Sequence, residues 1–362
     1  MFIQKIIVIY NLFILFIILK LNTCNEGVYN KKIHNTNSDN ILSNQTLYSN
    51  KNMVKNKNVI LGIIEKFSLN IILPFFKSLI NTNFHNCDVV IFVRNVSSTL
   101  INYLKNIGVF VYEVPILYRD IPIINVRWKL YIDFLKERKD EYKLVLSADI
   151  RDTFFQKDVF KYYENHEPFL GIAIEDGTLE EDYNKKWILD FVGEKIHKVI
   201  KNERIICVGT IWGTLDKFLE FSEIFWEKLI TYPKNIEQGI ANYLFYYEKI
   251  FKDCIVKSDN YGPIMTLGLT KSNDIIVDSD NNILNFRGEI ASVIHQYDRN
   301  SDLTIKVITK YSPELLIFNE IKNKFNIFQF RQILQCFVII VLLKLIIKKI
   351  QNDKLKSPDC NK

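Results

Sequence analysis

The sequence predicts an α/β domain built on a doubly wound, mostly parallel sheet, and two observations carry this prediction. Short apolar runs alternate with stretches of helical periodicity between residues 59 and 146, as in a chain of β–α–β units. The runs are continuously apolar rather than alternating, which is typical of parallel strands that helices cover on both faces. We therefore expect a single domain over residues 58–315, with a less regular second half.

The expected elements follow in order along the chain. In the first half they are a strand at 59–64, a helix at 70–79, a strand at 89–93, a helix at 100–106, a strand at 109–114, a helix at 127–136 and a strand at 142–146. Pro74 is expected near the first turn of its helix, where proline is tolerated, and Phe75, Phe76 and Leu79 give this helix its buried stripe. In the second half they are a strand at 169–175 that ends in an acidic loop, helices at 215–231 and 238–251, and a hairpin with strands at 275–277 and 283–286.

Apolar terminal segments flank this domain. Residues 6–19, within 1–24, are typical of a signal peptide or a signal-anchor, and residues 25–57 have the polar composition of a disordered stem. Residues 333–347, within 316–362, precede a basic tail and are expected either to span a membrane or to form an amphipathic helix packed on the domain. We therefore expect a membrane-attached protein of the secretory pathway, on the lumenal face of the Golgi or the endoplasmic reticulum.

Composition argues against nucleic-acid binding and against a zinc knuckle, and it leaves open whether three of the cysteines form a disulfide. The net charge of +6 comes partly from the basic tail, and no basic, aromatic-interleaved face is present in the core, so nucleic acid is not an expected partner. The six cysteines include no CxxC pair, which argues against a zinc knuckle. Cys87, Cys207 and Cys254 are candidates for one disulfide or for buried free thiols. Glycosylation sequons at Asn44 and Asn95 are compatible with a lumenal glycoprotein.

Residues 144–160 carry the strongest functional signal. An apolar run ends in small residues and is followed by Asp149, Arg151 and Asp152. A buried strand that delivers paired carboxylates at its C-terminal end is how an open α/β sheet builds a polar site. Such oxygen ligands suit Mg²⁺ or Mn²⁺, which are most useful where phosphates are held. The alternative is an acidic turn that caps the next helix.

Several blocks in the same order as in a known family carry a resemblance. Residues 147–158 resemble the D-x-RD-x-x-FQ-x-D-P-F block of GT-A-type nucleotide-diphospho-sugar glycosyltransferases, in a group that is widespread in eukaryotes. The further matching blocks lie at 75–79, 125–128, 184–188, 207–214, 237–243 and 295–299, the last of which reads HQYDR. Together they cover roughly residues 59–312, and one departure is Val159, where the family block has proline.

This resemblance implies a GT-A-like fold with a divergent acceptor half, and a hexosyltransferase-like enzyme. It would move a sugar from a UDP- or GDP-sugar to a glycan, protein or lipid acceptor, with Mn²⁺ or Mg²⁺ neutralising the departing diphosphate. Asp149 and Asp152 would hold the ion, with one of them acting through water or on the ribose. His295 is a reasonable third ligand, because neutral imidazole suits Mn²⁺; the alternative is a core histidine bonded to backbone.

Four further residues are candidates for binding the donor. Arg127 and Arg151 are expected either to contact the pyrophosphate or to form ordinary salt bridges with neighbouring acids. Gly209 and Gly213 would let the backbone approach the donor closely, or only make turns.

The catalytic group is a carboxylate in this interpretation. Glu237 stands where the family block has aspartate, and would be the general base on the acceptor hydroxyl or a nucleophile-like stabiliser; alternatively it is a charge at a helix N-terminus. Asp176 and Glu175 are loop carboxylates that would bind acceptor hydroxyls. Asn184 and Trp187 would bind sugar by amide hydrogen bonds and ring stacking, although Trp187 equally suits the core.

Two other functions compete with a transferase. A membrane-anchored binding or scaffold protein that retains the GT-A fold without turnover is the main alternative. A nucleotidyltransferase would use the same phosphate chemistry, but it usually brings a glycine-rich loop near the first strand, and residues 62–66 are not such a loop.

Overall fold

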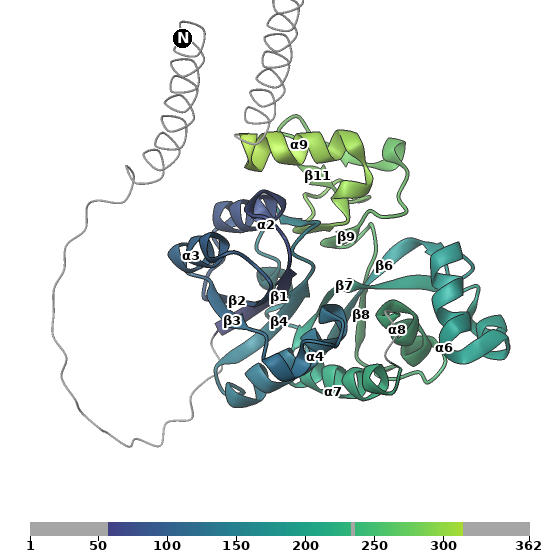
Figure 1. Cartoon of the computed structure of the whole chain (residues 1–362). Helices are drawn as coiled ribbons and strands as arrows, with labels where there is room; N and C mark the ends of the chain where they lie inside the picture. Colours follow the sequence, from purple (N-terminus) through teal and green to yellow (C-terminus); the bar gives the residue numbers. More distant parts are fainter. Residues whose placement is uncertain (1–56, 233–235, 314–362) are drawn as a thin grey trace, which may run out of the picture. The chain divides into compact units, whose positions relative to one another are not determined.

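A seven-stranded mixed sheet organises residues 57–232 and 236–313, the part of the chain that the computed structural model describes (Figure 1). In spatial order its strands are β3 (Phe110–Glu113), β2 (Cys87–Arg94), β1 (Lys57–Glu65), β4 (Tyr142–Ala148), β7 (Arg204–Thr214), β6 (Leu170–Thr178) and β8 (Ile255–Ser258). Pairing is parallel throughout, except that β7 runs antiparallel to both of its neighbours. The predicted mostly parallel sheet is therefore confirmed. The chain reverses its direction of growth between β1 and β4, and ligands of open α/β sheets bind at such a switch point.

Helices cover both faces of this sheet (Figure 1). The α-helices are α2 (Leu69–Thr82), α3 (Ser98–Asn106), α4 (Ile123–Glu137), α5 (Phe160–Tyr163), α6 (Asp182–Ile200), α7 (Leu215–Thr231), α8 (Glu237–Tyr246) and α9 (Ser301–Tyr311). Short 3₁₀ turns are η1 (Ile116–Tyr118), η2 (Ser272–Asp274) and η3 (Tyr297–Arg299). Val59, Leu61 and Ile63 of β1 pack with α4, α7 and α8, while the alternate Ile60 and Ile64 pack with α2 and α3.

A second, three-stranded sheet lies beside the first. Its strands are β9 (Ile264–Thr266), β12 (Val293–His295) and β5 (Thr153–Phe155), with β12 in the middle, antiparallel to β5 and parallel to β9. Phe154, Tyr297 and Tyr311 pack in the apolar cluster between this sheet and α9. The pairing of β5 with β12 brings residues 293–295 next to residues 153–155, although they are far apart in the sequence.

Most expected elements are found, with shifted ends. The helix expected at 127–136 begins earlier, at Ile123, and the helix expected at 238–251 ends at Tyr246. Pro74 lies inside α2 rather than near its first turn. The carbonyl that loses its hydrogen bond to Pro74 belongs to Asn70, which is exposed to water, so the helix continues past the proline. The predicted hairpin is confirmed, as β10 (Ile276–Val277) pairs antiparallel with β11 (Ile283–Leu284).

The expected signal segment (1–24), C-terminal segment (316–362) and sequon at Asn44 lie outside the described residues, as does the expected stem (25–57) except for Lys57, which begins β1. Among the helices that are described, none is long and apolar enough to cross a bilayer. Asn95 is exposed in the turn after β2, so its sequon is accessible. Cys87, Cys207 and Cys254 are free thiols, but of the three only Cys207 is buried, so the alternative of buried free thiols holds for Cys207 alone.

Candidate functional site

Two strand pairings assemble a cluster of Asp149, Asp152 and His295. Both aspartates lie in the turn that joins β4 to β5. At the start of this turn, the Asp149 backbone N–H donates to the carbonyl of Gly209 at 2.9 Å, which extends the pairing of β4 with β7. At its end, β5 pairs with β12 so that Thr153 faces His295, one residue from Asp152. The sheet topology therefore delivers the distant imidazole to the paired carboxylates.

The cluster has the dimensions of a cation site. One ligand atom from each of the three side chains lies within 4.8 Å of the others. His295 Nε2 lies 3.7 Å from Asp149 Oδ2 and 3.6 Å from Asp152 Oδ1, which is too far for hydrogen bonds. An octahedral ion with bonds of about 2.1 Å separates its ligand atoms by roughly 3 to 4 Å. Carboxylate oxygens suit Mn²⁺ or Mg²⁺, and of these two ions Mn²⁺ better accepts an imidazole nitrogen.

An unpartnered nitrogen supports the same interpretation. His295 is buried, and its Nε2 has no hydrogen-bond partner among the described residues. Its other nitrogen, Nδ1, lies 3.7 Å from the Cys207 thiol. A buried polar atom without a partner is costly, and a bound cation would remove that cost.

Gly209 makes room for this imidazole. A Cβ at position 209 would lie 2.5 Å from His295 Nε2 and 2.9 Å from Asp149 Oδ2, and closer still to His295 Cε1. Gly209 is not among the described glycines with positive φ, so space rather than backbone conformation requires glycine there. Gly209 therefore fits the ring between β7 and the turn, and its expected role in donor approach stays a prediction.

Charge pairing keeps both aspartates ionised. Burial by itself raises the pKa of Asp149, but Arg127 and His295 hold it below its ordinary value. Burial likewise opposes ionisation of Asp152, and His295 with Arg151 holds the pKa of this carboxyl far below its usual range. Burial lowers the pKa of His295, yet Cys207, Asp152 and Asp149 together raise it well above its ordinary value. The carboxylates are therefore in the state that metal binding needs, whereas His295 must release a proton when a cation binds.

Arg127 connects this cluster to Glu237. Its side chain is only 1% exposed, and it donates from NH1 to Asp149 Oδ1 at 2.6 Å and from NH2 to Glu237 Oε1 at 2.6 Å. NH2 also approaches the Val208 carbonyl at 3.3 Å. Of the two predicted roles for Arg127, the structure therefore supports the salt bridge. Because planar guanidinium pairs are directional, Arg127 fixes both carboxylates relative to each other.

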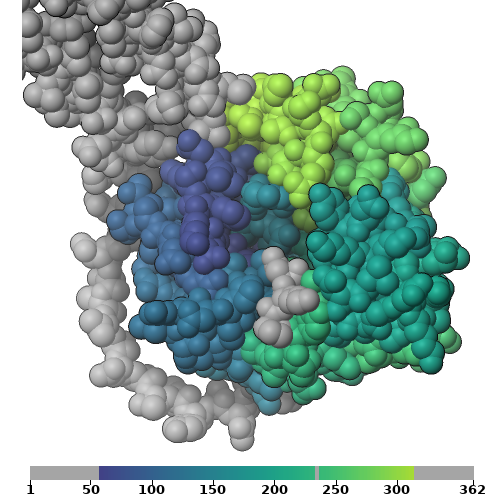
Figure 2. Space-filling view, turned by 45° about the vertical axis from the view of Figure 1, so that its right-hand side comes forward, coloured from purple at the N-terminus to yellow at the C-terminus, as the bar shows by residue number. Residues whose placement is uncertain are grey.

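Two adjoining cavities share the wall formed by Asp149 and Ile124. The first, of about 260 Å³, is lined by Glu65 at the end of β1, by Phe67 just after it and by the turn 149–152 after β4, and so lies at the switch point of the sheet. Arg151 lines this cavity with a side chain that is 42% exposed, 2.7 Å from Asp152 and 3.5 Å from Asp298. In the space-filling view the surface is hollowed between the purple-to-blue and the yellow-green segments (Figure 2).

The second cavity, of about 160 Å³, contains Glu237 and His295, with Trp187 and Gln238 beside them. Glu237 is the first residue of α8 and accepts hydrogen bonds from Arg127 and, at 3.2 Å, from Trp128 Nε1. Burial, opposed by Arg127 and helped by Asp149, raises the pKa of Glu237 to about 7. Its position also agrees with the alternative of a charge at a helix N-terminus.

Three predicted residues lie apart from these cavities. The Asp176 carboxylate accepts from Arg204, Asn260 and Thr270, and lines a separate hollow. Gly213 lies four residues beyond Gly209 on β7, roughly 13 Å away, because an extended strand rises about 3.3 Å per residue. A Cβ there would meet the Phe169 carbonyl oxygen at 2.5 Å, so Gly213 serves strand packing.

Asn184 is the third residue of this kind, since it is buried in α6 and lines neither cavity. It donates to Glu181 Oε2 at 2.7 Å and accepts from Gln238 Nε2 at 2.9 Å. Gln238 itself lines the second cavity. Asn184 therefore holds Gln238 in place and does not face the cavity itself.

Sequence reasoning missed several lining residues. Glu65 is the last residue of β1 and Phe67 lies just after it. Ligands of open α/β sheets bind at the carboxyl ends of the strands at a switch point, and this rule could have identified both residues. Glu175, expected in a loop, lies on β6 and is buried, and burial raises its pKa. No sequence signal placed Cys207 behind His295.

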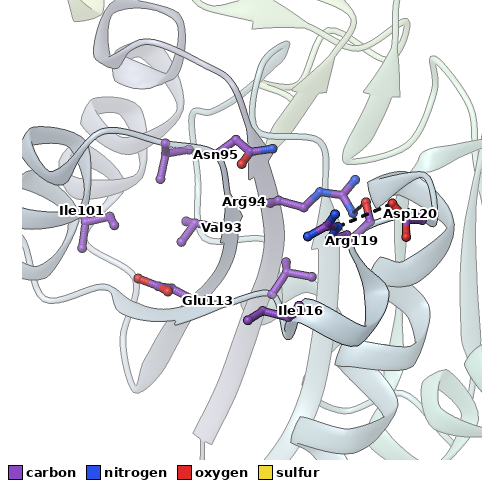
Figure 3. Close-up of a pocket in the computed structure, with 10 residues that line it drawn as sticks. Val93, Arg94, Asn95, Ile101, Glu113, Ile116, Arg119 and Asp120 are labelled. Atoms are coloured by element: carbon purple, nitrogen blue, oxygen red, sulfur yellow. Dashed lines mark hydrogen bonds and ion pairs between the residues drawn. The ribbon is translucent and has the colours of Figure 1, made fainter.

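A further cavity, of about 600 Å³, lies at the carboxyl ends of β2 and β3 (Figure 3). Arg94 lines it and pairs with Glu65 at 2.7 Å. Its NH1 also donates to the carbonyls of Tyr118 and Ile121, at 3.1 and 2.8 Å. Arg94 therefore ties the loop before α4 to the wall of the first site cavity.

The comparisons with known proteins give fold likeness only. No protein-family model and no curated protein sequence matches the chain. Among solved structures, an active-site mutant of LgtC is 13% identical, with a TM-score of 0.43 over 66% of this chain and 86% of that one. The galactosyltransferase LgtC in complex with donor and acceptor sugar analogues is 14% identical, with a TM-score of 0.41 over 69% and 95%. The glycosyltransferase GlyE of Streptococcus pneumoniae TIGR4 is 16% identical, with a TM-score of 0.42 over 74% and 64%. We base no argument on likeness at these TM-scores.

Proposed function

We propose that this protein is a metal-dependent glycosyltransferase that moves a sugar from a nucleotide-diphosphate donor to a glycan, protein or lipid acceptor. The observation that carries the proposal is the Asp149, Asp152 and His295 cluster between two adjoining cavities at the switch point of the sheet. One cavity would take the nucleotide and the other the reacting sugar. Motif resemblance in the sequence supports the same class of reaction.

The first cavity has the groups that a nucleotide diphosphate needs. A divalent ion held by the cluster would supply Lewis-acid neutralisation of the departing diphosphate. Arg151 offers a partly exposed guanidinium in the same cavity; it pairs with Asp152 and Asp298, and a cation bound at Asp152 would leave it able to bind phosphate oxygens. Phe67 and Ile63 give this cavity an apolar wall against which a base can pack.

Glu237 is suited to act on the acceptor. A general base is most effective when its pKa lies near the working pH, and burial raises the pKa of Glu237 to about 7. Its carboxylate lines the second cavity, where it would take the proton from an acceptor hydroxyl. Arg127 holds this carboxylate and Asp149 at once, so the base and the metal ligand keep a fixed separation.

We also propose a lumenal, membrane-attached location in the Golgi or endoplasmic reticulum. Support comes only from the sequence of residues 6–19 and 333–347. Protease protection of the whole chain in sealed microsomes tests this proposal. Digestion of the domain without detergent would contradict it.

Hydrolysis of nucleotide sugars tests the enzymatic proposal. The whole chain, in detergent with Mn²⁺, is incubated with a panel of UDP- and GDP-sugars, and release of the nucleoside diphosphate is measured. We expect release from at least one donor, its loss in Asp152→Ala, and its retention in the control Asp140→Ala, which removes an exposed carboxylate. A folded protein that neither binds nor hydrolyses any of these donors would favour the binding or scaffold alternative.

A further inference from the structure

A separate hollow, of about 480 Å³, lies at the same edge of the sheet as the metal cluster. Asp176 lies near the carboxyl end of β6, and Tyr261 follows β8. Both strands run parallel to β4, because β7 is antiparallel to β4 and to β6, and β8 is parallel to β6. Asp149 lies opposite Gly209 of β7, whereas Asp176 lies beyond Ile174, which pairs with Ile206. Two strand spacings of about 4.8 Å and an offset of about four residues along the strands therefore place the hollow roughly 16 Å or more from the turn that holds the cluster.

The walls of this hollow are held in place before any ligand arrives. Asp176 accepts hydrogen bonds from Arg204 at 3.1 Å and from Asn260 at 2.5 Å. On the other side, the Asp259 carboxylate accepts from the Tyr261 backbone N–H at 3.0 Å, and the Phe286 N–H donates to the Asn260 carbonyl at 2.7 Å. A pre-ordered wall loses little conformational entropy on binding.

An aromatic pair gives the hollow an apolar side. Tyr261 is 50% exposed, and its ring meets that of Phe286 edge to face, with centroids 5.3 Å apart. Such a ring offers an apolar face and a hydroxyl at one end. The Asp176 and Asp259 side chains are each about one-third exposed, so they retain lone pairs that accept from hydroxyl groups. An apolar face beside carboxylate acceptors matches a sugar ring, which has a C–H face and a rim of hydroxyls.

Charge argues against a phosphate-bearing ligand. Asp176 and Asp259 carry two negative charges, and Arg204 pairs with both, at 3.1 and 3.2 Å. The guanidinium is therefore already neutralised, and the net charge of these three groups is −1. A second nucleotide would be repelled, whereas a neutral saccharide would not.

We propose that this hollow binds a sugar unit of the acceptor, so that the acceptor is an oligosaccharide. The link between hollow and acceptor rests on the proposed glycosyltransferase function. The hollow and the metal cluster open at the same sheet edge but are separated by more than one sugar ring. One saccharide that contacts both must therefore contain several units, of which the outermost would reach Glu237.

Binding without donor tests this proposal. The whole chain carrying Asp152→Ala, which prevents turnover, is applied to an array of neutral oligosaccharides and of the monosaccharides that compose them. The best oligosaccharide is then titrated by saturation-transfer NMR. We expect Tyr261→Ala and Asp259→Asn each to weaken binding roughly tenfold, which corresponds to about 1.4 kcal/mol. The control Tyr162→Ala removes a tyrosine that is 51% exposed, on α5, and should leave binding unchanged.

Each outcome bears on the hollow separately from the transferase reaction. Oligosaccharide binding that Tyr261→Ala weakens and Tyr162→Ala does not would support the subsite, even if no donor were hydrolysed. Donor hydrolysis with no oligosaccharide binding would overturn the subsite and leave the enzymatic proposal standing. Oligosaccharide binding that is unchanged in both Tyr261→Ala and Asp259→Asn, while both variants unfold at the wild-type temperature, would also overturn the subsite. Tighter binding of a basic peptide than of any oligosaccharide would overturn it as well.

Discussion

Substitution of Gly209 by alanine should abolish the metal site. The added Cβ would lie 2.5 Å from His295 Nε2, whereas a relaxed contact between such atoms is about 3.5 Å or more. The buried ring must therefore move by about 1 Å, while metal–ligand distances tolerate only about 0.2 Å. Loss of an outer-shell partner weakens metal binding 10- to 100-fold, so displacement of a ligand should weaken it by at least about a hundredfold. Overpacking should also lower the free energy of unfolding by about 1 to 3 kcal/mol.

Manganese binding, followed by electron paramagnetic resonance of free Mn²⁺, measures this effect without any donor. Gly213→Ala is the matched control, because its Cβ would meet the Phe169 carbonyl at 2.5 Å on the same strand but far from the cluster. We expect Gly213→Ala to lose stability and to keep its affinity for Mn²⁺. Wild-type affinity in a folded Gly209→Ala protein would refute the assignment of His295 as a ligand.

Three further predictions concern buried groups. Arg127→Met leaves the carboxylates of Asp149 and Glu237 without their shared partner. It should lower the free energy of unfolding, measured by urea titration, by about 3 kcal/mol. The double variant Arg127→Met/Glu237→Gln should recover part of this loss. Because the pKa of Glu237 rises from 4.5 to about 7 on folding, the folded state retains a proton that the unfolded state releases between these values. Wild-type stability should therefore fall by about 3 kcal/mol relative to Glu237→Gln as the pH rises from 4.5 to 7.5, and parallel pH profiles of the two proteins would contradict this. Burial raises the pKa of Cys207 to about 12, so mass spectrometry should find this thiol unmodified by iodoacetamide in the native protein and modified after unfolding.

The sheet could be predicted from sequence because its signal is local. A continuous apolar run such as that of β4 reports burial on both faces, whichever strand pairs with it. The short strands β5, β9 and β12 carry three residues each, too few for a period to show. These strands form because they pair with one another, and no local sequence pattern predicts that pairing.

The same distinction between local sequence signals and long-range pairing applies to the residues of the site. Asp149 and Asp152 could be found because they follow a buried strand directly. His295 was placed with them only through motif resemblance. The pairing of β5 with β12 that brings it there is a long-range contact, which no local sequence pattern reports. Gly213 lies at the opposite end of the sheet from the cluster because β7 runs antiparallel to β4, whereas Asp176 lies at the same edge but two strands away and farther along β6. Arg127 looked like a phosphate ligand because burial is not visible in a short motif.

Much of the motif resemblance is explained by structural contacts rather than by chemistry. Gln156 bonds the backbone of Ile283 through both ends of its amide, and Asn242 does the same for Ile206 of β7. Ser78 accepts from the Phe155 backbone N–H at 3.0 Å and so ties α2 to β5. A non-catalytic scaffold with this fold would need all three contacts.

The features that separate an enzyme from a scaffold are therefore few. A scaffold gains little from a buried His295 Nε2 that lacks a hydrogen-bond partner among the described residues and is balanced, in the metal-free protein, only by the carboxylates of Asp149 and Asp152 at 3.7 and 3.6 Å. It also has no reason to leave position 209 without a side chain, because the nearest groups that a Cβ would crowd there are His295 and Asp149. A proton on His295 offsets part of the cost of this unpartnered nitrogen in the metal-free protein, and a bound cation would take the place of that proton. The metal site is thus the part of this fold that stability alone does not explain.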